Sequence, residues 1–341
     1  MATKSTDKRA TIRDVATVAG VSIGTVSRVL NGKSVSNRVL ESVNSAIKDL
    51  SYTPNAAAQS MRTNSTRAIG LVVNDISNPL FSGIAKGLDE VLSRNDYSLL
   101  IANTDNDPQR EQVIIKSLTQ RRVDGLVIAV SNEGDDNIKS LLRNVEFPVV
   151  LLDRELDIQA DSVCDDHADG MKKALRYLFD LGHEDIALIT GDNSVRPFRE
   201  RAMGYRDAYR KLGKPLNKNW IRQGQMNSLF GYEEAVRLLE GGKRPTAIIA
   251  GGNLILSGVL RAIHQFDLSI PEDLLLISCD EVDLAALMNP PITVIIRDIQ
   301  LIGQLAAEQI LRRIEGGADS APSRQSIPTE LVVRESCTRV S

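Results

Sequence analysis

Short apolar segments alternate with amphipathic helical stretches through most of this 341-residue chain. The segments read IGLVV, SLLIA, GLVIA, PVVLL, IALIT, TAIIA and LLLIS, at residues 69–73, 98–102, 125–129, 148–152, 186–190, 246–250 and 274–278. Strands that are apolar on both faces and separated by helices indicate parallel sheets built from βαβ units. Seven or more such units are more than one sheet holds comfortably. The pattern therefore predicts an α/β body with two Rossmann-like parallel-sheet subdomains.

The stretch TIRDVATVAGVSIGTVSRVLNG at 11–32 has a helical period instead. Thr11 and Ser22 are suited to cap two short helices, and Gly20 supplies the positive φ that ends the first one. Ser36 is a candidate cap for a third helix, which would complete a three-helix headpiece. The polar edge of the second helix, with Arg28, is then free to enter a DNA major groove, as in a helix-turn-helix. The alternative is two ordinary core helices around a glycine.

Charge separates these two regions. The whole chain has a net charge of −3, but residues 1–67 carry four Lys and six Arg against three Asp and one Glu, a net charge of +6. The remaining residues therefore carry a net charge of −9. A basic N-terminal region on an acidic body indicates a polyanionic partner at one end only, which favours DNA.

Cysteine usage and hydropathy bear on the compartment. Cys164, Cys279 and Cys337 are scattered and form no C-x-x-C motif, which fits a reducing environment. No apolar run of about twenty residues occurs, and the first ten residues are polar. We therefore expect a cytoplasmic protein that is not bound to a membrane. A periplasmic transport protein is the rival for residues 68–341 alone, but the missing signal peptide and the basic headpiece argue against it.

The sequence lacks the patterns of catalytic and metal sites. The histidines at 167, 183 and 264 are far apart and form no H-x-x-H or H-E-x-x-H motif. No G-x-S-x-G or phosphate-binding loop occurs, and Gly251-Gly252-Asn253 lacks the third glycine of a dinucleotide-binding loop. A solvated loop explains the adjacent Asp165 and Asp166 more simply than acid–base chemistry. We expect no enzyme, no catalytic residue, no cofactor and no metal.

Six segments resemble the LacI/GalR (lactose-repressor/galactose-repressor) family of bacterial transcription regulators. They are VSIGTVSRVLNG, SYTPNAAAQSMR, NDISNPLFSGIAKGLDE, RRVDGLVIA, LGHEDIALITG and IPEDLLLISCDE, and together they extend over essentially the whole chain. The resemblance implies a helix-turn-helix headpiece at 1–53 and a hinge helix with linker at 54–67. Residues 68–341 would form an effector-binding and dimerisation domain similar to periplasmic sugar-binding proteins.

By the same analogy the body has two subdomains, about 68–161 with 297–322 and about 162–296 with 323–341. The helix at Asp298–Ile314 would return the chain to the first subdomain. The last strand, near Ser326–Val333, would belong to the second.

The family resemblance also assigns roles in DNA binding. The first positions of the recognition helix and one a turn later would read bases, here Ile23, Gly24 and Arg28, and Arg suits guanine because it donates two hydrogen bonds to O6 and N7. In the hinge, Asn55 would cap a short helix, and Met61 would wedge between base steps where the family usually has Leu. The predicted DNA-binding residues are Thr11, Ser22, Ile23, Gly24, Thr25, Ser27, Arg28, Asn31, Lys33, Asn55 and Met61.

A ligand cleft in an open α/β sheet lies beyond the carboxyl ends of the strands. The resemblance implies that Arg201 and Asp280 hold the ligand there, while Phe81 would stack on a sugar face or plug the interface between the subdomains. The predicted effector-binding residues are Asp75, Phe81, Arg196, Arg201, Met226, Asn253, Asp280 and Arg297.

The nature of the effector rests on the charges in that cleft. Arg196, Arg199 and Arg297 add positive charge, and Gly252-Asn253 stands where the family usually has Asn-Asp. This balance favours a sugar acid or sugar phosphate over a neutral sugar, unless some of these arginines pair with carboxylates or face solvent. The expectation is a homodimeric repressor that binds palindromic operator DNA under the control of such an effector.

Overall fold

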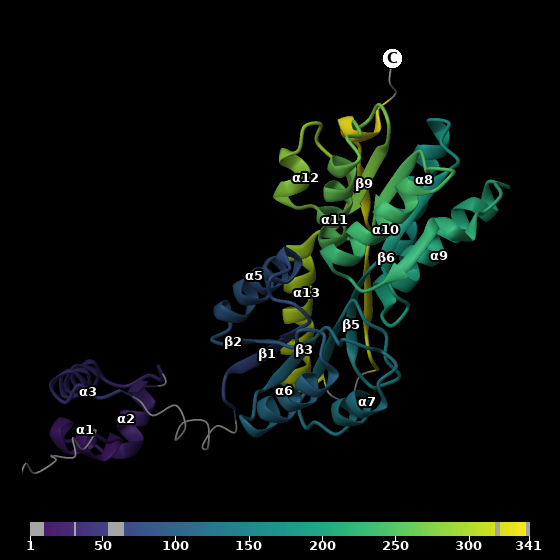
Figure 1. The fold of residues 1–341 in the computed structure, drawn as a ribbon. Helices are drawn as coiled ribbons and strands as arrows, with labels where there is room; N and C mark the ends of the chain where they lie inside the picture. Colours follow the sequence, from purple (N-terminus) through teal and green to yellow (C-terminus); the bar gives the residue numbers. More distant parts are fainter. Residues whose placement is uncertain (1–9, 31, 54–64, 318–320, 339–341) are drawn as a thin grey trace, which may run out of the picture. The chain divides into compact units, whose positions relative to one another are not determined.

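The computed structural model describes residues 10–30, 32–53, 65–317 and 321–338 (Figure 1). The chain divides into two compact units, Met1–Thr66 and Arg67–Ser341. The predicted body, 68–341, begins one residue later than the second unit. The predicted hinge residues Asn55 and Met61 lie outside the described residues, as does Asn31.

The described part of the first unit contains three helices, α1 (Ile12–Ala19), α2 (Ile23–Leu30) and α3 (Asn37–Asp49). They pack around side chains with no exposed surface, those of Val15, Val26 and Val43, so each helix contributes to one small core. The predicted three-helix headpiece is therefore present.

Local capping explains where two of these helices begin and end. The Asp14 amide donates to Thr11 Oγ1 at 3.4 Å, and the Thr11 amide donates to Asp14 Oδ2 at 2.7 Å, which is a capping box. Gly20 ends α1 at φ 66°, and Ser22 Oγ accepts the Thr25 amide at 3.1 Å. Ser36 is the N-cap residue of α3, as predicted, but its side chain makes no capping hydrogen bond.

The second unit contains two six-stranded sheets, one for each subdomain (Figure 1). The first sheet has the order β11-β5-β4-β3-β1-β2, and its strands are all parallel. Its strands are β1 (Ala68–Val73), β2 (Ser98–Asn103), β3 (Gly125–Ile128), β4 (Val149–Leu152), β5 (Asp161–Asp165) and β11 (Arg324–Ile327). The second sheet has the order β12-β10-β9-β8-β6-β7, and only β12 is antiparallel to its neighbour. Its strands are β6 (Ile186–Gly191), β7 (Ile221–Gly224), β8 (Ala247–Ala250), β9 (Leu275–Cys279), β10 (Thr293–Ile296) and β12 (Glu330–Val332).

Helices cover both faces of each sheet, which is why most of the central strands are buried on both sides. The first sheet packs against α5 (Pro79–Arg94), α13 (Ile299–Arg312), α6 (Pro108–Gln120) and α7 (Asp136–Arg143). The second packs against α8 (His167–Asp180), α9 (Arg196–Lys211), α10 (Ser228–Glu240), α11 (Asn253–Gln265) and α12 (Asp283–Leu287). Shorter turns of helix are η1 (Lys218–Trp220), η2 (Arg313–Gly317) and η3 (Glu335–Cys337). No helix among the described residues is both long enough and apolar enough to cross a membrane.

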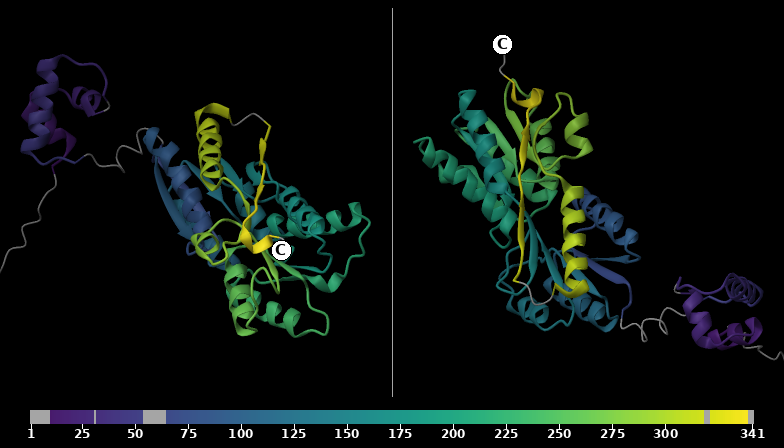
Figure 2. Two further views of the ribbon diagram at one scale, coloured as in Figure 1. Left: turned by 90° about the horizontal axis from the view of Figure 1, so that it is seen from above. Right: turned by 180° about the vertical axis from the view of Figure 1, so that it is seen from behind.

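Three connections pass between the sheets: from β5 to α8, from β10 to α13 and from β11 to β12. The predicted strand near Ser326–Val333 is therefore two strands, one in each sheet, and Figure 2 shows this yellow segment running from one to the other. The first connection between the sheets likewise follows Asp165, whereas the sequence predicts the boundary between the subdomains near Asp161. The sequence of β5, DSVCD, did not stand out because acidic residues occupy both of its ends.

Candidate effector cleft and nucleic-acid interface

A cavity of about 650 Å³ lies between the two subdomains. Its residues follow the carboxyl ends of the strands, as the parallel sheets lead one to expect. Six of the predicted effector-binding residues line it: Asp75, Phe81, Arg201, Met226, Asp280 and Arg297. Asp280 directly follows β9.

Arg297 joins the subdomains at the base of this cleft. It follows β10 of the second sheet, and its Nε donates to Asp280 Oδ1 at 2.8 Å. Its Nη1 donates across to the first subdomain, to Asp153 Oδ2 at 3.0 Å and Asp165 Oδ2 at 2.9 Å. The side chain is 6% exposed, so three carboxylates surround a buried guanidinium.

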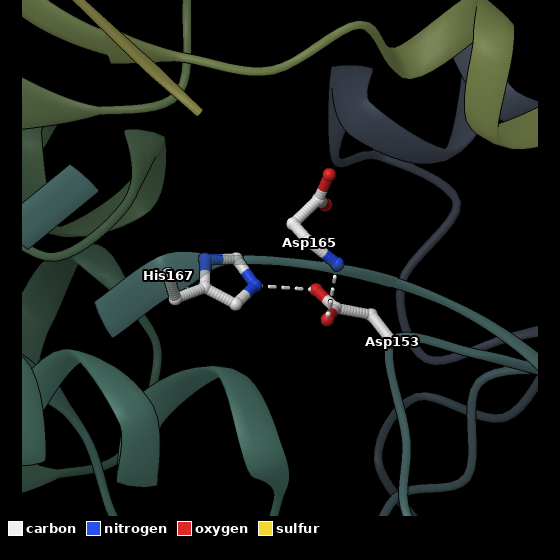
Figure 3. A group of neighbouring side chains, drawn as sticks. All are labelled: Asp153, Asp165 and His167. Atoms are coloured by element: carbon white, nitrogen blue, oxygen red, sulfur yellow. Dashed lines mark hydrogen bonds and ion pairs between the residues drawn. The ribbon is translucent and has the colours of Figure 1, made fainter. Parts of the chain in front are cut away.

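Asp153 is the most heavily bonded of these carboxylates. It receives His167 Nε2 at 2.6 Å, drawn in Figure 3, and Arg196 Nη1 at 3.0 Å in addition to Arg297. Burial alone would raise the pKa of Asp153, but His167, Arg297 and Arg196 outweigh it and hold that pKa far below its usual range. The carboxylate is therefore ionised at neutral pH.

Asp153, Asp165 and His167 place a ligand atom each within 4.8 Å of one another, which is the spacing of a metal site (Figure 3). Guanidinium groups already bond three of the four carboxylate oxygens: Arg297 bonds both aspartates and Arg196 bonds Asp153. A divalent ion would lie beside two positive charges. The cluster is therefore better explained as an ion-pair network than as a metal site.

The two groups assigned to hold the ligand lie next to each other on the second subdomain. Arg201 Nη1 donates to the Gly251 carbonyl at 2.7 Å, and its Nη2 lies 3.6 Å from Asp280 Oδ1. Burial alone would raise the pKa of Asp280, but Arg297 and Arg201 lower it overall. Among the arginines that contact a carboxylate at the cleft, Arg201 has the longest distance to its nearest carboxylate oxygen.

Two predicted effector-binding residues do not line the cavity. Arg196 is 7% exposed and bonds Asp153, the Asp165 carbonyl and Glu200. Asn253 Nδ2 donates to Asn78 Oδ1 at 2.9 Å, which bridges the two subdomains. A second bridge is formed by Glu133, which accepts the Arg196 amide at 2.8 Å.

The departure at Gly252-Asn253 has a steric explanation. Gly252 has φ 149°, a conformation that residues with a side chain rarely adopt. A Cβ at this position would overlap the methyl group of Met226. Glycine therefore makes room for Met226 in the wall of the cleft.

The expectation of spare positive charge in the cleft is wrong. Arg196 and Arg297 pair with carboxylates, and Arg199 pairs with Glu133 at 2.9 Å. The interpretation of Asp165 as part of a solvated loop is wrong too, because it is fully buried against Arg297. Asp166 caps α8 by accepting the Asp169 amide.

Sequence reasoning missed three groups of this site: Asp153, Arg154 and His167. Asp153 and Arg154 come directly after the predicted strand PVVLL, so the strand-end rule that singled out Asp75 could have found them. His167 begins α8 immediately after the unrecognised strand β5, so its position at the cleft had no visible signal.

The headpiece leaves the polar edge of its second helix accessible. Ile23 is 44% exposed, and Gly24, Ser22 and Arg28 are exposed as well. Thr25 and Ser27 are half-buried, while Thr11 and Lys33 are exposed. Arg28 makes no ion pair with the described residues, so its guanidinium is available to a partner.

A helix-turn-helix headpiece joined to a two-subdomain body with an enclosed cavity defines the class of DNA-binding regulators that carry an effector-binding domain. Comparison with known proteins agrees. The profile of bacterial regulatory proteins of the lacI family matches residues 11–55. The profile of periplasmic binding proteins and the sugar binding domain of the LacI family matches residues 66–335.

Individual proteins resemble the chain over most of its length. The ribose operon repressor of Escherichia coli K12 is 34% identical over 307 residues, 89% of this chain and 93% of its own. A lac repressor dimer bound to operator and the anti-inducer ONPF matches with a TM-score of 0.86 at 27% identity, covering 96% of this chain and 99% of its own. A complex of the transcriptional regulator CelR with cellobiose has a TM-score of 0.74 at 29% identity, covering 96% and 100%.

The chain belongs to the LacI family of bacterial transcription regulators. It is a DNA-binding repressor with an effector-binding domain. The family is not enzymatic, which answers the question of catalysis raised by the carboxylates of the cleft.

Proposed function

We propose that a small hydroxyl-bearing metabolite binds between the subdomains and changes the affinity of the headpiece for operator DNA. The observation that carries this proposal is the 650 Å³ cavity, whose lining comes from both subdomains. A ligand that contacts both would favour one relative arrangement of them over another. Operator affinity then changes to the extent that the ligand binds the two arrangements unequally.

The ligand contacts that we propose come mainly from Arg201 and Asp280. A guanidinium and a carboxylate side by side can donate to one hydroxyl and accept from its neighbour, which fixes the orientation of a sugar or polyol. Phe81 and Met226 would provide apolar walls. Asp75 and Arg297 complete the proposed set at the cavity, and Arg196 and Asn253 would act through the bridges described above.

We propose that Arg28 reads a base in the major groove, with Ile23 and Gly24 facing the same groove. Thr11, Ser22, Thr25, Ser27, Asn31 and Lys33 would hold the phosphate backbone. Asn55 and Met61 would act in the hinge, which lies in the part of the chain that the structure does not describe. Removing residues 1–66 should abolish DNA binding and leave ligand binding intact.

A homodimer bound to a palindromic operator in the cytoplasm is the assembly we propose. The edge strand β2 exposes Leu100 and Ile101, and Ile76 beside it is 54% exposed. An edge strand with exposed apolar side chains suits pairing with a second copy. Two-fold symmetry would then demand two operator half-sites.

The test begins with selection of a preferred duplex from a random library, using the full chain. The affinity for that duplex is then measured by fluorescence anisotropy with and without neutral sugars, sugar acids and sugar phosphates. We expect one ligand to change the operator affinity at least about fivefold, the lower end of ordinary allosteric coupling. A chain that binds its preferred duplex equally in the presence of every compound would contradict the proposal.

A further inference from the structure

Four arginines surround the cavity or its base, and three of them lie against carboxylates. Arg154, Arg201 and Arg297 line the cavity, and Arg196 lies behind it. Each is less than a tenth exposed. Each nitrogen of the Arg154 guanidinium donates one hydrogen bond, to the Val130 carbonyl at 2.6 Å, the Asp153 carbonyl at 3.0 Å and Asn74 Oδ1 at 3.2 Å. The carboxylate partners of the others have been given above.

Several carboxylate oxygens of the buried network have no donor. Among the described residues, Asp165 Oδ1, Glu111 Oε1 and Glu200 Oε2 are buried without a hydrogen-bond partner. No buried nitrogen of the four arginines is in that position. Figure 3 shows the Asp165 carboxyl group directed away from Asp153 and His167. The buried part of the network therefore has unsatisfied acceptors and no unsatisfied guanidinium nitrogen.

The accessible charges of the lining are negative. Asp75 and Asp192 both line the cavity and neither makes an ion pair with a described residue. The Oδ1 atoms of these residues accept the Ser77 amide at 2.9 Å and the Ser194 amide at 2.8 Å, which holds both side chains in their loops. Asp105, a third acidic residue of the lining, is paired with Arg110.

From these observations we infer that the cleft selects an uncharged, hydroxyl-rich ligand and excludes sugar acids and sugar phosphates. The inference deepens the function proposed above and rests on it. The charged group of a sugar acid or phosphate brings only acceptors, and to use Arg196 or Arg297 it must displace a buried carboxylate and leave that group unpaired. It must also pass Asp75 and Asp192, which repel it.

An uncharged polyol avoids both difficulties. Each hydroxyl can donate to a carboxylate and still accept from a guanidinium, so the ion pairs stay intact. Phe81, Phe198 and Met226 supply apolar surface for the CH groups of a sugar ring. The lining thus matches a neutral ligand in charge, in hydrogen bonding and in its apolar faces.

The test is calorimetric titration of the full chain with carbohydrates in matched sets. Two sets hold one carbon skeleton as the neutral sugar, the acid and the phosphate: ribose, ribonate and ribose 5-phosphate; glucose, gluconate and glucose 6-phosphate. A third set holds cellobiose and its acid, cellobionate. We expect the neutral member to bind at least about tenfold more tightly than its charged partners in any set that binds. Tighter binding of an acid or phosphate would overturn the inference and leave the proposed function standing. Failure of every compound to bind would overturn both.

One double variant and one control test whether the acidic side chains of the rim cause the exclusion of anions. Asp75→Asn with Asp192→Asn removes two charges, while the amide oxygens can still accept the Ser77 and Ser194 amides. The preference for the neutral member should fall about tenfold in this double variant. Asp180→Asn is the matched control, because Asp180 is exposed at the end of α8 and does not line the cavity.

Ionic strength provides an independent readout on the same proteins. Raising the ionic strength from about 0.05 M to about 0.5 M should reduce the preference for the neutral sugar over its charged partners in the parent and in Asp180→Asn, because salt screens the rim charges. The double variant should change little. A preference that ignores both salt and the double substitution would mean that rim charge does not exclude anions, and the inference would fall.

Discussion

The headpiece and the cleft use the same kind of side chain in opposite ways. Arg28 is exposed on a short helix and makes no ion pair with the described residues, whereas Arg297 is 6% exposed and touches three carboxylates. A polyanion can take an exposed guanidinium at little cost. A guanidinium that already holds a buried network can be withdrawn only by leaving carboxylates unpaired.

The difference shows that counting charges along a sequence has different value in the two regions. In the described part of the headpiece the positive charges are at the surface, where they indicate the partner; they are Arg13, Arg28, Lys33, Arg38 and Lys48. In the body Arg196 and Arg297 are paired with aspartates, and the carboxylates of the lining that make no ion pair with a described residue, Asp75 and Asp192, have the opposite sign. Positive charge at a site therefore predicts an anionic ligand only where its partners are known.

The largest expected effect comes from removing the hub of the cleft. Arg297→Met leaves Asp280, Asp153 and Asp165 without their shared partner, and we expect the body to lose about 3–5 kcal/mol of stability. Chemical denaturation followed by tryptophan fluorescence would measure it, since Trp220, the single tryptophan, is buried in the body. Arg28→Met is the matched control and should change the stability by less than about 0.5 kcal/mol. Equal effects of the two substitutions would erase the contrast between the regions.

The difference in stability between the parent and Arg297→Met should depend on pH. Burial would raise the pKa values of Asp153 and Asp280, but the neighbouring cations lower both overall. A lowered folded-state pKa gives stability that is present above the unfolded-state value, about 3.9, and is lost as the pH falls through the folded-state value. The stability gap between the parent and Arg297→Met should therefore shrink as the pH is lowered below about 4.

Asp165 differs from the other two carboxylates, because burial and Asp153 raise its pKa in spite of Arg297. Arg297 itself lowers the pKa of Asp165, so the part of the gap that comes from Asp165 is also lost as the pH falls and the carboxyl group is protonated in both proteins. Denaturation midpoints at several pH values would measure the gap. A gap that widens in acid would show that Arg297 does not stabilise the ionised carboxylates.

Much of the fold could be predicted because it depends on local patterns. Each of the seven apolar segments became a strand, since a strand covered by helices on both faces must be apolar on both. The headpiece helix boundaries at Thr11, Gly20 and Ser22 depend on contacts within a few residues. The strand β5 was missed because its ends, Asp161 and Asp165, are acidic and are neutralised by Arg313 and Arg297.

The arrangement of the cleft could be predicted only in part. The strand-end rule and the family resemblance put Arg201 and Asp280 at the right place. The partners of Arg297 could not be predicted, because Asp153 is 144 residues away in the sequence and contacts Arg297 only after the chain has crossed between the sheets. The charge of the lining is a property of those pairings, so it could not be read from composition.

In the headpiece, loss of Arg28 should affect DNA binding and leave folding alone. Arg28→Ala should lower the affinity for the preferred duplex by about 1–3 kcal/mol and relax the preference at one base pair. Anisotropy titrations with the preferred duplex and with single-base variants would measure both changes. Arg38→Ala, which removes another exposed arginine from the same unit, is the comparison. A uniform loss on all duplexes would make Arg28 a phosphate contact instead of a base reader.

The smallest expected effect separates two caps of the headpiece. Thr11 forms the capping box with Asp14, so Thr11→Ala should weaken α1 by about 1 kcal/mol, whereas Ser36→Ala removes no capping hydrogen bond and should change α3 by less than about 0.5 kcal/mol. Amide hydrogen exchange of the full chain without DNA would measure both, because it reports each helix separately and is insensitive to phosphate contacts. If Ser36→Ala speeds exchange in α3 as much as Thr11→Ala does in α1, then Ser36 caps its helix in solution after all. The contrast between a headpiece set by local bonds and a cleft set by distant ones would then be stronger.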